Sequence, residues 1–496
     1  MSEVVTVAAA KEENVIQYRK AANWQIILSQ MNNASAMIFY TLAGLMSYLA
    51  NEGYGIVMAA AGLILTVTRV FDGVIDPFIA LIIERVNTRF GKLRLFMLIG
   101  WFVRSLAVFM LFVWGSSSNY GTFYFIFVYV IFIIGSSIYD IAGNMIPPVM
   151  TNDPKQRPLI QVWSTVYSYL VPTALSLTIA LVLLPRFDNQ YSVELLSAAA
   201  LLFVPISLIF TILCCIGVSA VDKPENFIGV SADGSVQSVH VRDMFQLFKR
   251  NRPFQMYLVS SVSAKLAQQT TSQAIVSTLL FGILIGNIQL GTTLNIISIF
   301  PSILFAIVGA KYAGKFGNKT ATVMWTWISI IISVLSVVLL LVIDTRMIPQ
   351  NKILMVVFVG LLILSNGAKM CITIANGAMR SDVVDYELDQ SGKFMPAVIT
   401  STYNFVDQFV TSLGATIAAG AVSLVGYTTV APQPTDDLTS PIKYMTLILY
   451  YGIPIMGWIA GLIAMKYYKL SKEEVIDMQQ RIHDKKQKIL TENVSN

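Results

Sequence analysis

The sequence predicts an all-α membrane protein of twelve transmembrane helices arranged in two six-helix bundles. The first observation is composition, because charged residues make up only 12% of the 496 residues and apolar residues make up 55%. Soluble proteins carry about 25% charged residues, so this chain has too little charge for a water-facing surface. The other observations are the recurrence of long apolar stretches and the distribution of Lys and Arg between them.

The apolar stretches are each long enough to cross about 30 Å of hydrocarbon, and the breaks between them are short except after the sixth. We therefore predict an N-terminal segment 1–23, a bundle 24–220, a central loop 221–252, a bundle 253–466 and a tail 467–496. The twelve predicted spans lie near residues 24–49, 54–86, 96–115, 121–150, 158–184, 194–220, 253–286, 290–313, 320–343, 353–380, 396–427 and 441–466.

Lys and Arg gather in the segments on one side of these spans. The other side carries only Arg186, Arg346, Lys352 and Lys443. Because positive loops stay in the cytoplasm, we expect both termini, the central loop and the loop after span ten, with Arg380, to be cytoplasmic in a cell membrane. The net charge of +6 then reflects this bias and requires no nucleic acid, although the basic tail is expected to contact anionic lipid.

The sequence lacks the motifs of several enzyme and metalloprotein classes. Three cysteines inside apolar stretches exclude a disulfide scaffold, and two histidines leave little room for a His-rich metal site. The chain has no Walker-type phosphate loop, no HExxH and no GxSxG, so it is neither an ATP-driven pump nor a membrane hydrolase of those kinds. We expect no enzyme activity.

Ionisable residues also lie inside the predicted spans, where each costs about 2.5 to 3.5 kcal/mol on insertion scales. Such residues normally face a polar interior and have a function there, and for each the alternative is a helix-tying ion pair or a position near a span end. They are Arg69, Arg104, Lys265, Lys369, Asp72, Asp76, Asp140 and Asp407.

Asp72 and Asp76 are four residues apart, so on one helix their carboxylates share a face at about 6 Å. At an effective dielectric constant near 20 their repulsion is roughly 3 kcal/mol, which favours a proton or a cation held between them. Pro77 frees a backbone carbonyl nearby. We therefore predict a hard-cation site at Asp72 and Asp76, and the alternative is a compensating Arg69 to Asp72 pair.

Three motifs then resemble one family. Residues 69–94 read RVFDGVIDPFIALIIERVNTRFGKLR, residues 137–157 read SIYDIAGNMIPPVMTNDPKQR, and residues 381–386 read SDVVDY. In this order they resemble the glycoside-pentoside-hexuronide cation symporters, typified by the melibiose carrier, of the major facilitator superfamily. The resemblance implies the major facilitator fold, a coupling cation (Na⁺, Li⁺ or H⁺) at Asp72 and Asp76, and sugar hydroxyls bound by Asp140.

Two positions depart from the family pattern. The sugar-binding aspartate of helix one falls near Ala36, with Asn33 close by, and the lysine of helix eleven aligns with Gln408. We hypothesise that Lys265 or Lys369 supplies the missing positive charge beside Asp407. Further substrate contacts are expected from the polar run of span seven and from an aromatic ring that can stack on a sugar; these candidates are Gln269, Gln273 and Trp163.

The leading interpretation is secondary active transport, in which two six-span halves expose a midplane site alternately and a cation drives symport of a sugar or glycoside. The chain would then need no cofactor besides the coupling ion, bind a small-molecule substrate and work as a monomer. The alternatives are a carrier of lysolipid or another organic solute, and an uncoupled facilitator or sensor.

Overall fold

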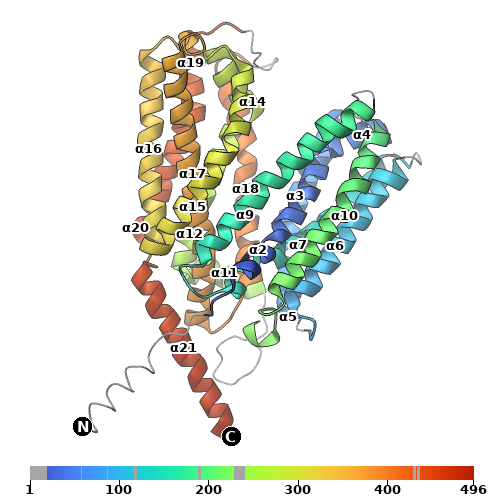
Figure 1. Ribbon diagram of the computed structural model, residues 1–496, viewed down its shortest axis with the longest axis vertical. Helices are drawn as coiled ribbons and strands as arrows, with labels where there is room; N and C mark the ends of the chain where they lie inside the picture. The colour runs from blue at the N-terminus through green and yellow to red at the C-terminus, as the bar shows by residue number, and fades with distance from the viewer. Residues whose placement is uncertain are drawn as a thin grey trace.

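The computed structural model describes residues 19–56, 58–86, 88–116, 120–187, 192–227, 241–427, 432 and 436–495. These residues are mostly helical and contain no β-strand. The helices form two bundles that lie close together at the end near α11 and α21 and diverge toward the opposite end (Figure 1). We call these the closed end and the open end. The predicted all-α fold with two bundles is confirmed.

The first bundle contains the helices that precede the central connection. Their order along the chain is α2 (Asn23–Ser29), α3 (Met31–Gly44), α4 (Met46–Tyr54), α5 (Met58–Arg85), α6 (Lys92–Phe109), η1 (Met110–Gly115), α7 (Gly121–Asn144), α8 (Ile146–Met150), α9 (Arg157–Thr178), η2 (Ile179–Leu183), η3 (Leu184–Arg186) and α10 (Val193–Val218).

The second bundle follows a connection that holds two helices, η4 (Pro224–Phe227) and α11 (Val241–Arg250), where only a polar loop was predicted. The rest of that loop, residues 228–240, lies outside the described residues. The remaining helices are α12 (Arg252–Thr271), α13 (Ala274–Ser277), η5 (Thr278–Leu284), α14 (Ile288–Ile297), α15 (Ile299–Phe316), α16 (Asn318–Val342), η6 (Thr345–Met347), α17 (Lys352–Ser391), α18 (Pro396–Ser423), α19 (Ser440–Leu447), η7 (Ile448–Gly452), α20 (Ile453–Tyr467) and α21 (Lys472–Ser495).

Eight helical segments in the described part of the chain are long and apolar enough to cross a membrane. They match predicted spans three to six, eight to ten and twelve. The other four predicted spans are also helical, as α2 to α4, α5, α12 to η5 and α18, and each carries charged or amide side chains within its length. These four spans carry Asp72, Asp76, Lys265 and Asp407 of the site described below.

Glycines bring α6 and α7 into close contact in the first bundle. A Cβ added at Gly100 would lie 2.6 Å from the backbone nitrogen of Tyr139, and one at Gly135 would lie 2.6 Å from that of Arg104. Small residues at a helix crossing let two backbones approach, as is common inside membranes. This contact holds the side chains of Arg104 and Tyr139 against each other.

The two bundles repeat one local structure. Gly91 precedes α6 and Gly317 precedes α16, and both have φ 92° and ψ 153°, a conformation that favours glycine. Beside Gly91, the carboxylate of Asp222 accepts hydrogen bonds from the first backbone amides of α6, with Lys92 N at 2.8 Å. The bundles are built on related plans.

Helix α17 is longer than predicted. Its 40 residues continue to Ser391, past the expected end of span ten at Arg380, and an α-helix of that length spans about 60 Å. Arg380 was placed in a cytoplasmic loop, and this placement is wrong because the helix does not end there. The tail packs on the extension: Lys485 of α21 forms an ion pair with Asp389 at 2.8 Å.

Candidate functional site

Asp72 lies where three helices from both bundles meet. Its carboxylate accepts hydrogen bonds from the Ser137 hydroxyl of α7 and from Gln408 Nε2 of α18, the latter at 3.1 Å. Gln408 belongs to the second bundle, and α5 packs along α18. The predicted acidic pair is therefore on the seam between the bundles and does not face lipid.

Asp76 is one turn further along α5 and is 3% exposed. Its Oδ1 atom has no hydrogen-bond partner among the described residues, while Ser137 and Asn404 are its polar neighbours. Asp72 and Asp140 act on it electrostatically. A buried carboxylate oxygen without a donor is costly, so the arrangement favours a proton or a cation at that atom.

The two predicted cation ligands, Asp72 and Asp76, thus have Ser137 and Asn404 as polar neighbours. In the described part of the chain, no group of three or more His, Cys, Asp or Glu side chains is placed to hold a metal ion. Oxygen ligands of this kind suit hard cations. The carboxylate and hydroxyl oxygens present are compatible with the small cation or proton that the sequence predicts, and that site stays a prediction.

Arg104 provides a positive charge near the acidic cluster. It is 1% exposed, and its guanidinium lies 4.0 Å from the ring centre of Phe39 and 3.6 Å from that of Tyr139. It donates a hydrogen bond to Ser35 Oγ at 2.9 Å. Asp140 follows Tyr139, is exposed to solvent and interacts electrostatically with Arg104. The side chain of Arg69 lies outside the described residues, so its predicted pair with Asp72 stays a prediction.

The second bundle contributes a cluster of opposite character. Lys265 Nζ lies 2.7 Å from Asp407 Oδ2, and it lies 5.2 Å from the ring centre of Tyr403. The guanidinium of Arg380 lies 4.5 Å from the same ring, and it donates to the Tyr257 hydroxyl and to Asn144 Oδ1, each at 3.3 Å. Of the two cations predicted beside Asp407, the structure places Lys265 there, because α12 packs against α18.

Lys369 does not reach Asp407, and its predicted pairing is wrong. Its ammonium lies 5.8 Å from the ring centre of Trp458 and 6.0 Å from that of Tyr450. The described residues contain no ion pair to this lysine. It lines a cavity of about 480 Å³ between α9 and the second bundle.

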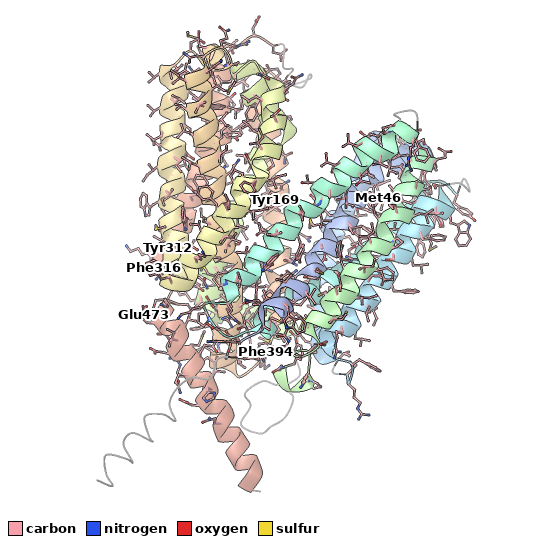
Figure 2. The ribbon with its side chains drawn as sticks, viewed as in Figure 1. Met46, Tyr169, Tyr312, Phe316, Phe394 and Glu473 are labelled. Carbon is pink, nitrogen blue, oxygen red and sulfur yellow. The ribbon has the colours of Figure 1, made fainter. Side chains whose placement is uncertain are left out.

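The cavity is lined by polar side chains of α12 and α17, and α9 closes it from the first bundle through Gln161 and Tyr169. Figure 2 shows Tyr169 on the stretch of α9 beside the second bundle. The α17 wall is a stripe with spacings of three and four residues, which keeps one face of the helix toward the cavity. Its members are Asn366, Lys369, Thr373, Asn376 and Arg380.

Other predicted substrate contacts lie away from this cavity. Asn33 donates to Gln30 Oε1 at 3.1 Å, and Trp163 packs against Tyr167 with ring centres 6.1 Å apart. On α12 the cavity face is displaced by one residue from the prediction: Gln269 lies against Gly414, and Gln268 lines the cavity instead. Gln273 lies in the bend that follows α12, and its side chain donates to the backbone oxygen of Gln269 at 2.9 Å. The polar run alone did not reveal which of its residues face inward.

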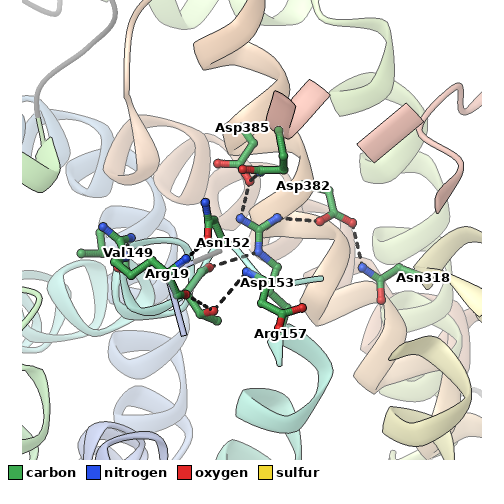
Figure 3. A network of polar contacts seen from close by, with 10 residues as sticks. Arg19, Val149, Asn152, Asp153, Arg157, Asn318, Asp382 and Asp385 are labelled. Atoms are coloured by element: carbon green, nitrogen blue, oxygen red, sulfur yellow. Dashed lines mark hydrogen bonds and ion pairs between the residues drawn. The ribbon is translucent and has the colours of Figure 1, made fainter. Parts of the chain in front are cut away.

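The closed end is held by ion pairs between the bundles. Arg157, at the start of α9, lies 2.8 Å from Asp382 and also pairs with Asp385, both on α17 (Figure 3). Asn318 donates to Asp382 at 2.7 Å, and Gln479 of α21 donates to Asp385 at 2.6 Å. A further tie joins Glu84 Oε1 of α5 to the backbone nitrogen of Ala397, at 2.8 Å.

Comparisons with known proteins agree with this architecture. A family model described as MFS/sugar transport protein matches residues 30–472. The chain belongs to this family. Its expected place among the glycoside-pentoside-hexuronide cation symporters of the major facilitator superfamily is confirmed by relatives that match along most of the chain.

Two such relatives are bacterial. The chain is 23% identical over 462 residues to the putative glycoside/cation symporter YagG of Escherichia coli (strain K12), covering 90% of this chain and 91% of the relative. It is 24% identical over 482 residues to the isoprimeverose transporter of Lactiplantibacillus pentosus, covering 90% and 89%. Among solved structures, the MFS transporter FucP in the outward conformation superposes with a TM-score of 0.61 at 12% identity, covering 90% of this chain and 98% of that one. That likeness shows the fold.

Proposed function

We propose that this chain is a secondary active transporter in which a cation bound at Asp72 and Asp76 drives symport of a sugar or glycoside by alternating access. The observation that carries the proposal is the position of Asp72, which the first bundle supplies and to which Gln408 of the second bundle donates. An ion held there acts on the contact between the bundles. Its binding therefore shifts the balance between conformations that expose the site on opposite sides.

The chemistry of the site supports the coupling ion. Asp72 and Asp76 would hold it, with the Ser137 hydroxyl and the Asn404 side chain beside them. The ion supplies the positive charge that two neighbouring carboxylates need in order to stay close in a low-dielectric environment. When the ion leaves, their repulsion is restored, which disfavours the same packing of α5 against α18.

The closed end then acts as the barrier on one side. Arg157 with Asp382 and Asp385 seals it, while the cavity lies between the bundles above. From the positive-inside pattern of the sequence we infer that this end, together with α21, is cytoplasmic. In this orientation the open end faces the exterior, and substrate enters from there.

The cavity favours a sugar over a lysolipid, the main alternative substrate. Its walls carry amide, hydroxyl and ammonium groups, among them Asn366, Gln268 and Lys369, which match the hydroxyls of a sugar. Of the relatives named above, one is a putative glycoside/cation symporter and the other an isoprimeverose transporter, which supports the same substrate class.

The test is uptake of labelled glycosides into vesicles that contain the purified chain, with an inward Na⁺ or H⁺ gradient. Wild-type protein should accumulate substrate above equilibrium. Asp72→Asn and Asp76→Asn should each reduce accumulation to simple equilibration while substrate exchange continues, because the ion site is lost and the cavity is not. Asp437→Asn, which removes the same charge from an exposed loop, should accumulate normally. Uphill uptake in a variant that lacks both carboxylates would contradict the proposal.

A further inference from the structure

The central cavity has an unbalanced charge. Its described lining residues include three cations, Lys265, Lys369 and Arg380, and no Asp or Glu. Asp407, just behind the wall, pairs with Lys265 at 2.7 Å and acts electrostatically on Arg380 as well. One carboxylate therefore faces two of the three cations and can balance only one positive charge, so the cavity keeps an excess of positive charge.

Lys369 is the cation that the protein does not neutralise. Lys265 has its ion pair, and Arg380 is engaged by Tyr257, Asn144 and the ring of Tyr403. The contacts recorded for the Lys369 ammonium are two aromatic faces, at 5.8 Å and 6.0 Å, which attract a cation without cancelling its charge. An ammonium in a membrane-spanning helix is costly without a counter-charge, so its retention implies that a ligand supplies one.

The surroundings of Lys369 define the rest of that ligand. Asn366 and Thr373 lie on the same stripe of α17, one turn to either side, and present amide and hydroxyl groups to the cavity. Trp458 offers a flat apolar face beside the ammonium, as sugar rings require for stacking. A cavity of about 480 Å³ is within the range of small-molecule sites. A ring bearing hydroxyls and one negative group fits these features.

We propose that Lys369 binds a carboxylate of the substrate and that the transported compound is an anionic sugar, a glycoside with a uronic acid group. This inference rests on the proposed transport function and narrows its substrate. An ammonium and a carboxylate form a charge-assisted hydrogen bond, about twice as strong as a neutral one. Lys369 is thus a specificity-determining residue that distinguishes a uronide from the matching neutral glycoside.

The test is equilibrium binding to the purified full-length chain in detergent with Na⁺ present and no gradient. Methyl glucopyranosiduronic acid and methyl glucopyranoside form the ligand pair, because they differ only at C6. The uronide should bind at least about 10-fold more tightly. Lys369→Met and Lys369→Gln should remove this preference by weakening uronide binding much more than neutral-glycoside binding, and Lys369→Arg should keep part of it. Lys311→Met removes a lysine from an exposed position outside the cavity lining and should bind as wild type does.

The opposite results overturn the inference. The inference is wrong if the wild type binds the two ligands equally or does not bind the uronide at all. It is also wrong if Lys369→Met and Lys369→Gln both keep the full preference for the uronide and a wild-type melting temperature. Tighter binding of glucose 6-phosphate than of the uronide would also overturn it, because it would assign a phosphate to the site. A failure of the symport proposal can be told apart from a failure of this inference. Uronide binding without gradient-driven uptake contradicts symport and leaves the carboxylate site supported. Gradient-driven uptake of neutral glycosides alone supports symport and contradicts the carboxylate site.

Discussion

The two bundles share a scaffold and differ in charge. Gly91 and Gly317 take the same backbone conformation before α6 and α16, so the connection is repeated in both halves. The first bundle nevertheless carries the carboxylates of Asp72, Asp76 and Asp140 close enough to act on one another, and the second carries three cations on the cavity wall. One plan therefore carries the proposed cation site in one half and the proposed site for an anionic substrate in the other. At the closed end the polarity reverses, since the first bundle supplies Arg157 and the second supplies the carboxylates.

The largest expected effect comes from removing the charge at the closed end. Arg157→Gln leaves Asp382 and Asp385 without their cation, and breaking a buried pair in this way is destabilising by about 3 to 5 kcal/mol. The closed end should open far more often. A cysteine at Thr373, which is exposed in the cavity, should then react with an impermeant maleimide added from the α21 side.

The matched control for this experiment is Arg481→Gln. Arg481 pairs with Asp389 and Glu474 within the second bundle and its tail, so its loss does not separate the bundles. Labelling at Thr373→Cys should stay at the background level. Equal labelling in the Arg157 and Arg481 variants would show that the pairs between bundles do not hold the end closed.

A smaller effect tests which lysine balances Asp407. Asp407→Asn should lower transport by about 10-fold, because Lys265 is half-exposed and solvent already screens its charge. The exchange of Lys265→Asp with Asp407→Lys should recover part of the loss. The exchange of Lys369→Asp with Asp407→Lys should recover none, since those side chains do not meet. The measurement is the initial rate of uptake. Recovery by the second exchange would show that Lys369 does pair with Asp407, as the sequence suggested.

The smallest effect concerns Gln408, which the sequence resemblance aligns with a lysine of the family. Gln408→Lys places an ammonium beside Asp72 and should raise the cation concentration needed for half-maximal uptake several-fold, because a fixed charge competes with the ion. Gln408→Glu adds a negative charge and should lower that concentration. A shift in the same direction for both variants would mean that Gln408 acts through packing and not through charge.

The sequence predicted the features that depend on local patterns. Apolar length gave the spans, and the four-residue spacing of Asp72 and Asp76 gave one helix face, because both follow from helix geometry. Their position at a seam with α18 agrees with the motif resemblance. The candidate cation site could be proposed from the sequence because its two carboxylates lie about one turn apart on one helix.

The cavity depended on contacts between distant residues, which no spacing fixes. Lys265 is 142 residues from Asp407, and the competing choice of Lys369 was equally compatible with the sequence. Arg380 was assigned to a loop because hydropathy falls there, although the helix continues to Ser391. A usable signal was present: the 3-4-3-4 spacing of polar residues from Asn366 to Arg380 in an otherwise apolar helix indicates one inward face.

Helix α17 joins the substrate cavity to the closed end without a break. Lys369 and Asp382 are 13 residues apart on it, about 20 Å along an uninterrupted axis. A helix of this length is stiff, so a sugar bound at Lys369, as proposed, is expected to move Asp382 and Asp385, which pair with Arg157, together with the lysine. Substrate binding at Lys369 and release of the Arg157 ion pairs would then both depend on the position of this one helix. Two glycines inserted between Lys369 and Asp382 would make the helix flexible and allow either event without the other.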